Sequence, residues 1–362
     1  MPRLRFPPGY GTIKDNQKGD FPMGNAKYLI QRVLNMNYKA MFGKIRAIHR
    51  KTGRSRWSIF QDMRRCAVKY GAGYMDYDLF EMYNLTDEQR ETYLTRGRNN
   101  DLVKRYNDPA YMDIFADKSV FNARFGQFLH RDWVHVTGDN REEVLDFLRR
   151  HPVFMSKPAR GSCGWGIEKL DTADYPSLDA LYGYLAEKAP LLELEEVIVQ
   201  HPAVAAIYPG AINTVRMVTI RGKSGRVYLV TAMFRIGNGK YVDNFNSGGM
   251  VAPMDPESGT VIDRALDKQK NLYVDHPATG APIKGFVFPD WDKAKKLVED
   301  AAQVVPELGY VGWDVCFTPD GPCLVEGNQF PGHDIYQLPV HTPDKIGIMP
   351  RFWAIEEAEQ KL

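Results

Sequence analysis

The sequence has few cysteines and no long apolar run. Its four cysteines are spread over 362 residues and none stands in a C-x-x-C pair, so we expect no disulfide scaffold. No uncharged apolar stretch approaches the ~20 residues that a membrane-spanning helix needs. The first residues are basic but no apolar segment follows them, and a signal peptide is therefore not expected. Together these absences favour a reducing cytoplasm.

Internal repeats, low-complexity segments and long linkers are also absent from the sequence. A hydrophobic fraction of 44% and a charged fraction of 25% are ordinary for a soluble globular protein. A length of 362 residues exceeds one ordinary domain and suits two or three packed subdomains.

The nearly neutral net charge of +2 hides an uneven distribution. The first 110 residues carry 21 Lys and Arg against 11 Asp and Glu, whereas the rest carry 26 against 34. Between Lys27 and Lys69 there are twelve basic residues and a single acid, Asp62. This segment is a solvated helix face, a docking surface for an anionic membrane, or an RNA-binding surface in which Tyr38, Phe42 and Trp57 interleave the charges. Nucleic acid is the less favoured partner.

The spacing of apolar residues predicts two structural regions. The first 110 residues are expected to be mostly helical, with helices over 27–48 and 57–70. From residue 117 onward, short β-branched runs alternate with helical stretches, which indicates an α/β or α+β fold. The predicted strands are Val134–Thr137, Val153–Lys157, Glu195–Gln200, Thr214–Ile220, Val227–Arg235 and Val311–Thr318. The predicted helices of this region are Arg141–Arg150, Ser177–Ala189 and Trp291–Val305.

The stretch from Gly312 to Asn328 predicts a β-hairpin with a tight turn at 319–321. A hairpin places Asp314 opposite Glu326 near its open end, with Asn328 on the same face as Glu326. Two carboxylates and an amide oxygen form an all-oxygen set that suits magnesium held together with nucleotide phosphates. The alternative is an ordinary surface hairpin.

A second element joins a strand to a glycine-rich loop. The strand brings Lys157, and the loop after it contains Gly161, Ser162, Gly164 and Gly166. Glycines let backbone N–H groups approach phosphate oxygens, and a lysine adds a point charge. The loop matches neither of the two common phosphate-binding glycine motifs, so a plain turn remains an alternative.

Two further elements follow along the chain. The acidic strand Glu195–Gln200 could hydrogen-bond adenine and ribose, although an edge strand is the simpler interpretation. Arg235 ends a strand that leads into the amide-rich loop 243–250, which contains Asn244 and paired glycines. Such a loop suits a lid that meets a transferring phosphoryl group, and an exposed hairpin loop is the alternative.

These four elements, in this order, resemble the ATP-grasp superfamily. The resemblance extends from about Asp62 to Pro339 and implies an α+β fold in which two α/β subdomains clasp ATP after an N-terminal basic helical region. The implied division is residues 1–115 for that region, 116–200 for the subdomain with the glycine loop and hinge, and 201–362 for the subdomain with the metal site. Upstream, Lys118 in Asp117-Lys118 resembles the lysine that reaches a nucleotide phosphate.

The amino-acid sequences of several motifs are similar to those of one branch, the sugar-transfer-associated ATP-grasp proteins. The matching phrases are Asn213-Thr214-Val215-Arg216, Gln200-His201-Pro202, Gly312-Trp313-Asp314, Glu326-Gly327-Asn328 and Tyr70-Gly71 with Asp76-Tyr77. The branch is associated with cell-surface polysaccharide synthesis. Two departures stand out: Cys163 lies within the glycine loop, and no arginine stands two positions before Asp314. Arg216 or Arg235 would then supply that charge.

The resemblance implies an ATP-dependent carboxylate–amine ligase that forms an acyl phosphate and then an amide. Magnesium, with manganese as an alternative, would be held by Asp314, Glu326 and Asn328. The implied nucleotide-binding residues are Lys118, Lys157, Ser162, Gly164, Glu195, Glu196, Ile198, Asn213 and Asn244. The implied catalytic residues are Arg235, Arg216 and Lys157.

The implied partners are a small carboxylate and an amine, with a lipid-linked sugar among the candidates. The expected location is the cytoplasm, with peripheral contact at the inner face of the membrane through Lys27–Lys69. A sugar kinase that uses the same ATP site and a non-catalytic nucleotide-binding scaffold remain alternatives. The sequence names neither substrate nor oligomeric state.

Overall fold

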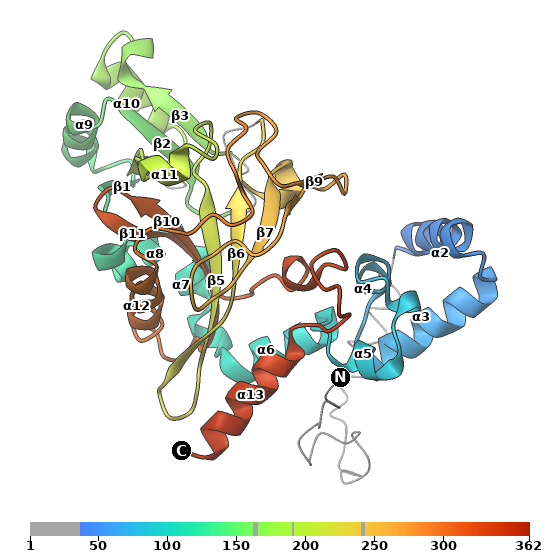
Figure 1. Cartoon of the computed structure of the whole chain (residues 1–362). Helices are drawn as coiled ribbons and strands as arrows, with labels where there is room; N and C mark the ends of the chain where they lie inside the picture. Colours follow the sequence, from blue (N-terminus) through green and yellow to red (C-terminus); the bar gives the residue numbers. More distant parts are fainter. Residues whose placement is uncertain (1–36, 162–165, 190–191, 240–242) are drawn as a thin grey trace. The chain divides into compact units, whose positions relative to one another are not determined.

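The structure is a computed structural model, and it describes residues 37–161, 166–189, 192–239 and 243–362 (Figure 1). Residue contacts divide the chain into a small unit, residues 1–60, and a large unit, residues 61–362. Helices cover the described chain up to Phe128, as predicted for the basic N-terminal region. The subdomain boundaries at 115/116 and 200/201 stay a prediction.

The small unit contains α2 (Tyr38–Thr52) and the first turn of α3 (Arg56–Tyr70). Helix α2 begins where the Asn37 side chain accepts a hydrogen bond from the backbone N–H of Ala40 at 2.9 Å. It ends at Gly53, whose φ of 71° is accessible to glycine at little cost. The predicted helix 27–48 is confirmed from residue 38, and its first residues lie outside the described part.

The helices of the large unit fall into two groups along the chain. Those before the first strand are α4 (Tyr74–Leu79), α5 (Asp87–Glu91), α6 (Arg96–Tyr106), α7 (Asp113–Ala116) and α8 (Lys118–Phe125). The later ones are α9 (Arg141–Arg150), α10 (Leu178–Ala186), α11 (Pro202–Ala205), α12 (Trp291–Ala301) and α13 (Met349–Gln360). Short 3₁₀ helices lie at Met82–Asn84, Pro109–Tyr111, Gly126–Phe128, Thr172–Asp174, Phe245–Ser247 and Ile335–Gln337.

Two antiparallel sheets organise the large unit. The smaller sheet has the order β1-β4-β2-β3, and its strands are Trp133–Val136, Leu192–Glu196, Val153–Pro158 and Glu168–Asp171. The larger sheet has the order β11-β10-β5-β6-β7-β8-β9. Its strands, in chain order from β5, are Thr214–Arg221, Val227–Ile236, Met250–Met254, Ala265–Leu266, Leu272–Tyr273, Tyr310–Thr318 and Gly321–Asn328.

Each sheet is covered by helices that bury apolar faces. Helix α9 carries acids in its first turn and Arg149 and Arg150 in its last, which complements the helix dipole, and it packs with α10 on the smaller sheet. Alternation along β6 sends Phe234 into a core shared with α8 and α12, and Met233 into a second core shared with α6 and α13. In Figure 1, α12 and α13 flank the long strands β5 and β6.

Most predicted elements are confirmed, and one strand was placed wrongly. The structure has strands and helices at the other predicted positions, with ends shifted by a few residues. The exception is Glu195–Gln200, because the strand there is β4, Leu192–Glu196, and residues 197–200 are not part of a strand. The edge-strand interpretation is also wrong, since β4 lies between β1 and β2. Its alternate leucines, Leu192 and Leu194, are buried with α9 and α10 and determine the register.

No helix in the described residues is both long enough and apolar enough to cross a membrane. The three cysteines that the structure describes, Cys66, Cys316 and Cys323, are buried and reduced. The last two face each other across β10 and β11 with their sulfurs 3.2 Å apart.

Candidate functional site

The hairpin β10–β11 has the geometry that the sequence predicts. Asp314 lies opposite Glu326, and Gly312 lies opposite Asn328. The pairing register shifts directly after Asp314, at a β-bulge. A bulge bends and twists the strand at this point, so the two carboxylates lie where the hairpin departs from regular geometry.

Two arginines from neighbouring strands hold Asp314. Arg216 on β5 donates from Nε to Oδ1 at 2.5 Å and from Nη2 to Oδ2 at 3.0 Å, while Arg235 on β6 donates from Nη1 to Oδ2 at 2.5 Å. Burial alone would raise the pKa of Asp314, but the two guanidinium groups outweigh it and hold that pKa well below its usual range. Asp314 therefore stays ionised while 3% exposed.

Arg235 is itself held by a second carboxylate, Asp243. Its Nη2 donates to Asp243 Oδ1 at 3.1 Å, and the backbone N–H of Thr214 donates to Asp243 Oδ2 at 3.0 Å. Burial raises the pKa of Asp243, and the charge of Arg235 opposes that rise. Sequence reasoning selected Arg235 and Asn244 here and missed Asp243, which connects β5, β6 and the loop after β6.

Glu326 is held differently from Asp314. In the described ranges its carboxylate makes no hydrogen bond or ion pair, although Arg216, Arg235 and Lys118 are close enough to act on its charge. Burial, and then the charge of Asp314, raise the pKa of Glu326. The hairpin therefore carries one carboxylate that protein cations neutralise and a second that lacks a bonded cation.

Lys157 on β2 belongs to a buried charge chain. Its Nζ donates to Glu195 Oε2 at 2.6 Å, and Arg131 Nε donates to the same oxygen at 2.7 Å. Arg131 also donates to the backbone carbonyl oxygens of Leu324 at 2.6 Å and Val325 at 3.2 Å, beside the bulge. Sequence reasoning missed Arg131, which connects the lysine, through Glu195, to the strand that carries Glu326.

Glu193 lies behind this chain and is fully buried. It accepts from Asn122 Nδ2 at 3.3 Å, and His135 Nδ1 lies 3.0 Å from its other oxygen. Burial first, and then the charge of Glu195, raise the pKa of Glu193 to about 8. The site thus holds one glutamate that stays protonated near neutral pH and another that stays ionised.

We expect Glu193→Gln to flatten the pH dependence of stability. The folded state keeps a proton on Glu193 that the unfolded state has lost, so the free energy of unfolding falls as pH rises from the ordinary value of 4.5 to about 8. Glutamine keeps the neutral form at every pH. Thermal melts across this interval should show a smaller loss of Tm in the variant, and an unchanged slope would contradict the assignment.

Lys118, the first residue of α8, contacts the start of the glycine loop after β2. Its Nζ donates to the carbonyl oxygen of Gly161 at 3.1 Å, and its backbone N–H donates to the carbonyl oxygen of Ala159 at 2.8 Å. Burial lowers the pKa of Lys118, Glu326 opposes this, and Lys157 adds to it. The start of the glycine loop thus lies against the predicted phosphate lysine, whereas Ser162 and Gly164 lie outside the described residues.

One pocket in the large unit brings most of the predicted residues together. The predicted residues that line this pocket are Lys118, Lys157, Glu195, Glu196, Ile198, Arg235, Asn244, Asp314 and Glu326. Its apolar lining includes Phe115, Phe121, Met155, Ile167, Val197, Ile198 and Ile212. Within the described chain, the backbone polar groups of Ile198 are left without hydrogen bonds, so they are available to a ligand.

Three predicted residues do not line this pocket. Arg216 affects the pocket indirectly, because it donates a hydrogen bond to Asp314, which lines the pocket. Asn328 lies two residues after Glu326 on β11. Its side-chain oxygen accepts a hydrogen bond from the backbone N–H of Phe330 at 2.9 Å. Asn213 is fully buried, donates to the carbonyl oxygen of Tyr208 at 2.7 Å and accepts from the backbone N–H of Gly237 at 3.0 Å. We therefore revise Asn213 from a nucleotide ligand to a residue that supports the loop before β5.

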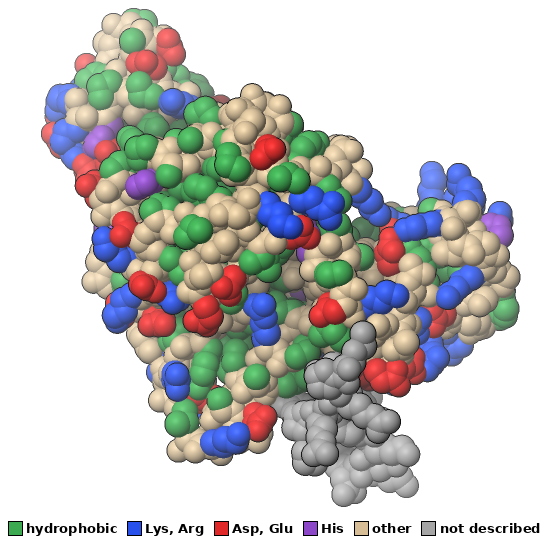
Figure 2. Space-filling model, in the orientation of Figure 1, with side chains coloured by type: hydrophobic (Ala, Val, Ile, Leu, Met, Phe, Trp, Pro, Cys, Tyr) green, Lys and Arg blue, Asp and Glu red, His purple; other side chains and the backbone are tan. Residues whose placement is uncertain are grey.

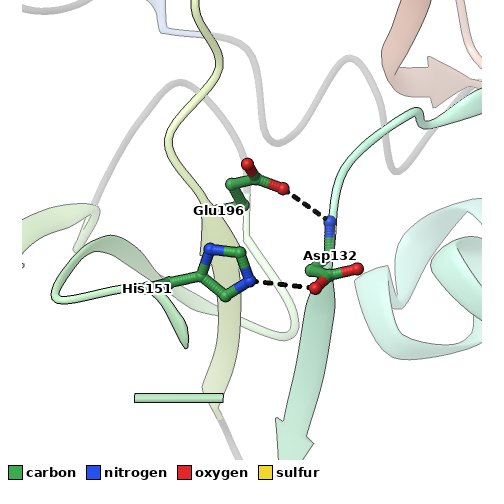
Figure 3. A group of neighbouring side chains, drawn as sticks. All are labelled: Asp132, His151 and Glu196. Atoms are coloured by element: carbon green, nitrogen blue, oxygen red, sulfur yellow. Dashed lines mark hydrogen bonds and ion pairs between the residues drawn. The ribbon is translucent and has the colours of Figure 1, made fainter. Parts of the chain in front are cut away.

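Glu196 also has a structural partner. Its Oε2 accepts from the backbone N–H of Asp132 at 3.0 Å, and His151 Nε2 lies 2.9 Å from Asp132 Oδ2 (Figure 3). These three side chains are close enough for one metal ion. However, Arg150 also pairs with the Asp132 carboxylate, so a guanidinium already neutralises it. The cluster ties the end of β4 to the start of β1.

The turn after the hairpin is anchored as well. His333 Nε2 lies 2.8 Å from Asp76 Oδ1, and Asp76 Oδ2 accepts from the backbone N–H of Arg96 at 2.9 Å. Asn99 Nδ2 donates to the carbonyl oxygen of Pro331 at 2.9 Å. Helices before the first strand therefore hold the segment that follows the carboxylate hairpin.

The pocket fits a metal–nucleotide complex by its donor chemistry. Glu326 lacks a bonded cation, and Asp314 Oδ1 accepts one hydrogen bond and so keeps a lone pair. Oxygen donors of this kind suit magnesium. Lys118, Lys157 and Arg235 line the same pocket as an apolar wall, which matches the two ends of a nucleotide triphosphate.

The chain resembles proteins of the ATP-grasp type. The model of the sugar-transfer associated ATP-grasp family matches residues 178–356, which include β4, Arg235 and the whole carboxylate hairpin. The predicted resemblance to this branch and the predicted α+β ATP-grasp fold are thereby confirmed. The comparison with curated proteins found no match.

The comparison with solved structures also found similar chains. The ATP-grasp ligase PsnB complexed with minimal precursor is 15% identical, with a TM-score of 0.38 over 68% of this chain and 63% of that one. N5-carboxyaminoimidazole synthetase from Staphylococcus aureus complexed with ADP is 10% identical, with a TM-score of 0.40 over 62% and 48%. The biotin carboxylase domain of the Hydrogenobacter thermophilus 2-oxoglutarate carboxylase is 14% identical, with a TM-score of 0.36 over 60% and 40%. The chain thus spans about three fifths of the length of PsnB.

Proposed function

We propose that the protein is an ATP-dependent carboxylate–amine ligase that works through an acyl phosphate. The observation that carries the proposal is the single pocket in which Lys118, Lys157 and Arg235 line the same space as Asp314 and Glu326. Cations for phosphate oxygens and carboxylates for magnesium thus share one space that also has an apolar wall. The ATP-grasp assignment supports the same chemistry.

The nucleotide is held along the length of the pocket. The base lies against the apolar wall, where the backbone of Ile198 is available for hydrogen bonds. Lys118 and Lys157 hold the polyphosphate. Ser162 and Gly164 of the glycine loop, which lie outside the described residues, are proposed as backbone partners. Glu195 positions Lys157 by accepting a hydrogen bond from its Nζ at 2.6 Å. Asn244 contacts the phosphate end from the loop after β6.

Asp314 and Glu326, with Asn328 beside them, are the proposed magnesium ligands, and manganese is an alternative ion. The bound ion supplies charge screening between the triphosphate and the incoming carboxylate. Glu326 gains most from such an ion, because it replaces a missing cation next to Asp314.

The proposed reaction needs no protein nucleophile. A carboxylate oxygen of the substrate attacks the γ-phosphorus, the bond to the β-phosphate oxygen breaks, and ADP leaves. An amine nitrogen then attacks the acyl carbon, phosphate leaves with the bonding electrons, and the amine loses a proton to solvent. Arg235 borders the pocket and stabilises the charge of the transferring group, and Arg216 positions Asp314. Catalysis is then mainly positioning and electrostatics.

The proposed substrates are a small carboxylate and an amine in cell-surface polysaccharide or related sugar-conjugate synthesis. The family description, sugar-transfer associated ATP-grasp, supports this biological setting. We place the reaction in the cytoplasm, at the inner face of the membrane, where a lipid-linked sugar would be within reach.

The test is ADP release by the purified protein with Mg-ATP across pools of amino acids and nucleotide sugars. We expect turnover only when a carboxylate and an amine are both present, and a product that carries an amide. A stable phosphorylated sugar formed without an amine would establish a kinase instead. Binding of ATP without turnover in any pool would favour a scaffold.

A further inference from the structure

The described part of the small unit exposes three aromatic side chains within twenty residues. Tyr38 is 44% exposed, Phe42 50% and Trp57 67%. Single exposed apolar residues are common on protein surfaces. Three large aromatic side chains close together in the sequence, in a segment of two short helical pieces, indicate a surface that is covered in use.

The same segment carries only positive charge. Residues 37–60 contain seven basic residues and no acid: Lys39, Lys44, Arg46, Arg50, Lys51, Arg54 and Arg56. All of them except Lys44 are exposed. In Figure 2 the Lys and Arg side chains gather over α2. The ligand of this surface is therefore anionic.

Helical geometry places aromatic residues and cations on one side of α2. Met41, Ile45 and Ile48 form its buried stripe. Tyr38, Phe42, Arg46 and Arg50 follow one another at four-residue spacing, so they form a row along the exposed side. The row begins with two rings and continues with two guanidinium groups, so aromatic and cationic side chains share one exposed side of the helix.

We propose that Tyr38, Phe42 and Trp57, with the surrounding Lys and Arg, bind the surface of an anionic lipid bilayer. The rings enter the headgroup region, and the cations contact lipid phosphate and carboxylate groups. This extends the proposed location at the membrane and is independent of the ligase chemistry. It gives the small unit a role in holding the enzyme beside a lipid-linked substrate.

Two observations favour a bilayer over RNA. The Trp57 ring stacks on Phe60 with centroids 5.7 Å apart and planes 27° apart, so the two rings form one aromatic surface rather than separate stacking platforms. Single-stranded RNA is bound mainly by stacking bases on open ring faces, whereas Trp and Tyr are enriched where proteins meet the membrane interface. Phe42 stands within a helix row among cations, where it would anchor a helix that lies flat on lipid.

The experiment is co-sedimentation of the full chain with vesicles. Vesicles with about 30% phosphatidylserine in phosphatidylcholine should pellet the protein at low salt, vesicles of phosphatidylcholine alone should not, and ~1 M salt should release it. Replacing Lys39, Arg46, Arg50 and Arg54 together with Gln should weaken binding by about several hundredfold, since each charge contributes about fivefold and the four factors multiply. Replacing Lys223 and Lys270, exposed in the large unit, with Gln is the matched control and should leave binding unchanged.

The rings are tested separately from the charges. Phe42→Ser with Trp57→Ser should weaken vesicle binding several-fold and leave far-ultraviolet circular dichroism unchanged, because both side chains are exposed. The proposal is wrong if the full chain does not bind anionic vesicles at low salt, or if the charge variant and the lysine control lose binding equally. It is also wrong if single-stranded RNA binds and displaces the protein from vesicles. Mg-ATP binding in the charge variant should equal that of the wild type, so failure here and failure of the ligase proposal are distinguishable.

Discussion

Glu326→Gln is expected to reduce magnesium-dependent ATP turnover by at least about a hundredfold without loss of stability. Within the described residues Glu326 has no bonded partner, and burial together with Asp314 already disfavours its charge. Glutamine removes that cost but also removes the anionic oxygen proposed for the metal. Steady-state ADP release and thermal melts should therefore show an inactive protein whose Tm is equal to that of the wild type or higher.

The comparison with Asp314→Asn makes this prediction specific. Asp314 neutralises Arg216 and Arg235, so its loss leaves the buried Arg216 without a carboxylate partner and Arg235 with Asp243 alone, and should cost about 3–5 kcal/mol of stability along with activity. Asp320→Asn, in the exposed turn of the same hairpin, is the matched control and should change neither property. An active Glu326→Gln protein would remove Glu326 from the metal site.

Arg131→Met is expected to lower the free energy of unfolding by about 3–5 kcal/mol. The Arg131 side chain is 2% exposed and that of Glu195 is 3% exposed, so the substitution leaves an ionised carboxylate in the interior with Lys157 as its remaining cation. It also leaves the carbonyl oxygens of Leu324 and Val325 without this donor. Chemical denaturation of the variant and the wild type measures the loss.

A double variant separates the charge from the packing. Glu195→Gln in the Arg131→Met background should recover part of the lost stability, because it removes the uncompensated charge. Arg150→Met is the control, since Arg150 is half exposed and its ion pairs should contribute at most about 1 kcal/mol. No recovery in the double variant would show that Arg131 acts through its carbonyl contacts alone.

The carboxylate hairpin could be predicted from sequence because its signals are local. The turn residues at 319–321 set the pairing as far as Val315 and Leu324, and the bulge directly after Asp314 then brings Asp314 opposite Glu326. The position of β4 could not be predicted in the same way. Val197, Ile198 and Val199 have the composition of a strand, but Ile198 lines the pocket, and the buried leucines before it pair with β1 and β2.

The partners of the charged residues were missed because they are distant in sequence. Arg131 meets Glu195 across 64 positions, and Arg216 meets Asp314 across 98. No periodicity or local motif connects such residues before the sheets are assembled. Asp243 could have been predicted as a site residue, because it stands one position before the predicted Asn244 and eight after Arg235.

Two glycines of the hairpin allow close packing, although the sequence analysis used them only as part of the motifs. A side chain at Gly327 would collide with the Phe115 ring at 2.2 Å, so glycine there lets α7 pack against the carboxylate strand. A side chain at Gly312 would lie 3.2 Å from the Arg216 side chain, which must pass to reach Asp314. At Gly327 glycine is thus needed for close approach rather than for a turn, whereas at Gly312 an added side chain would require Arg216 to shift by a few tenths of an ångström.

The central claim is that this pocket binds ATP through magnesium at Asp314 and Glu326. Calorimetric titration of the full chain with a non-hydrolysable ATP analogue, with and without Mg²⁺, tests it most directly. We expect saturable binding at one site that weakens when magnesium is removed and that loses its magnesium dependence in Glu326→Gln. Absence of nucleotide binding, or binding with the same magnesium dependence in the variant, would contradict the site described here.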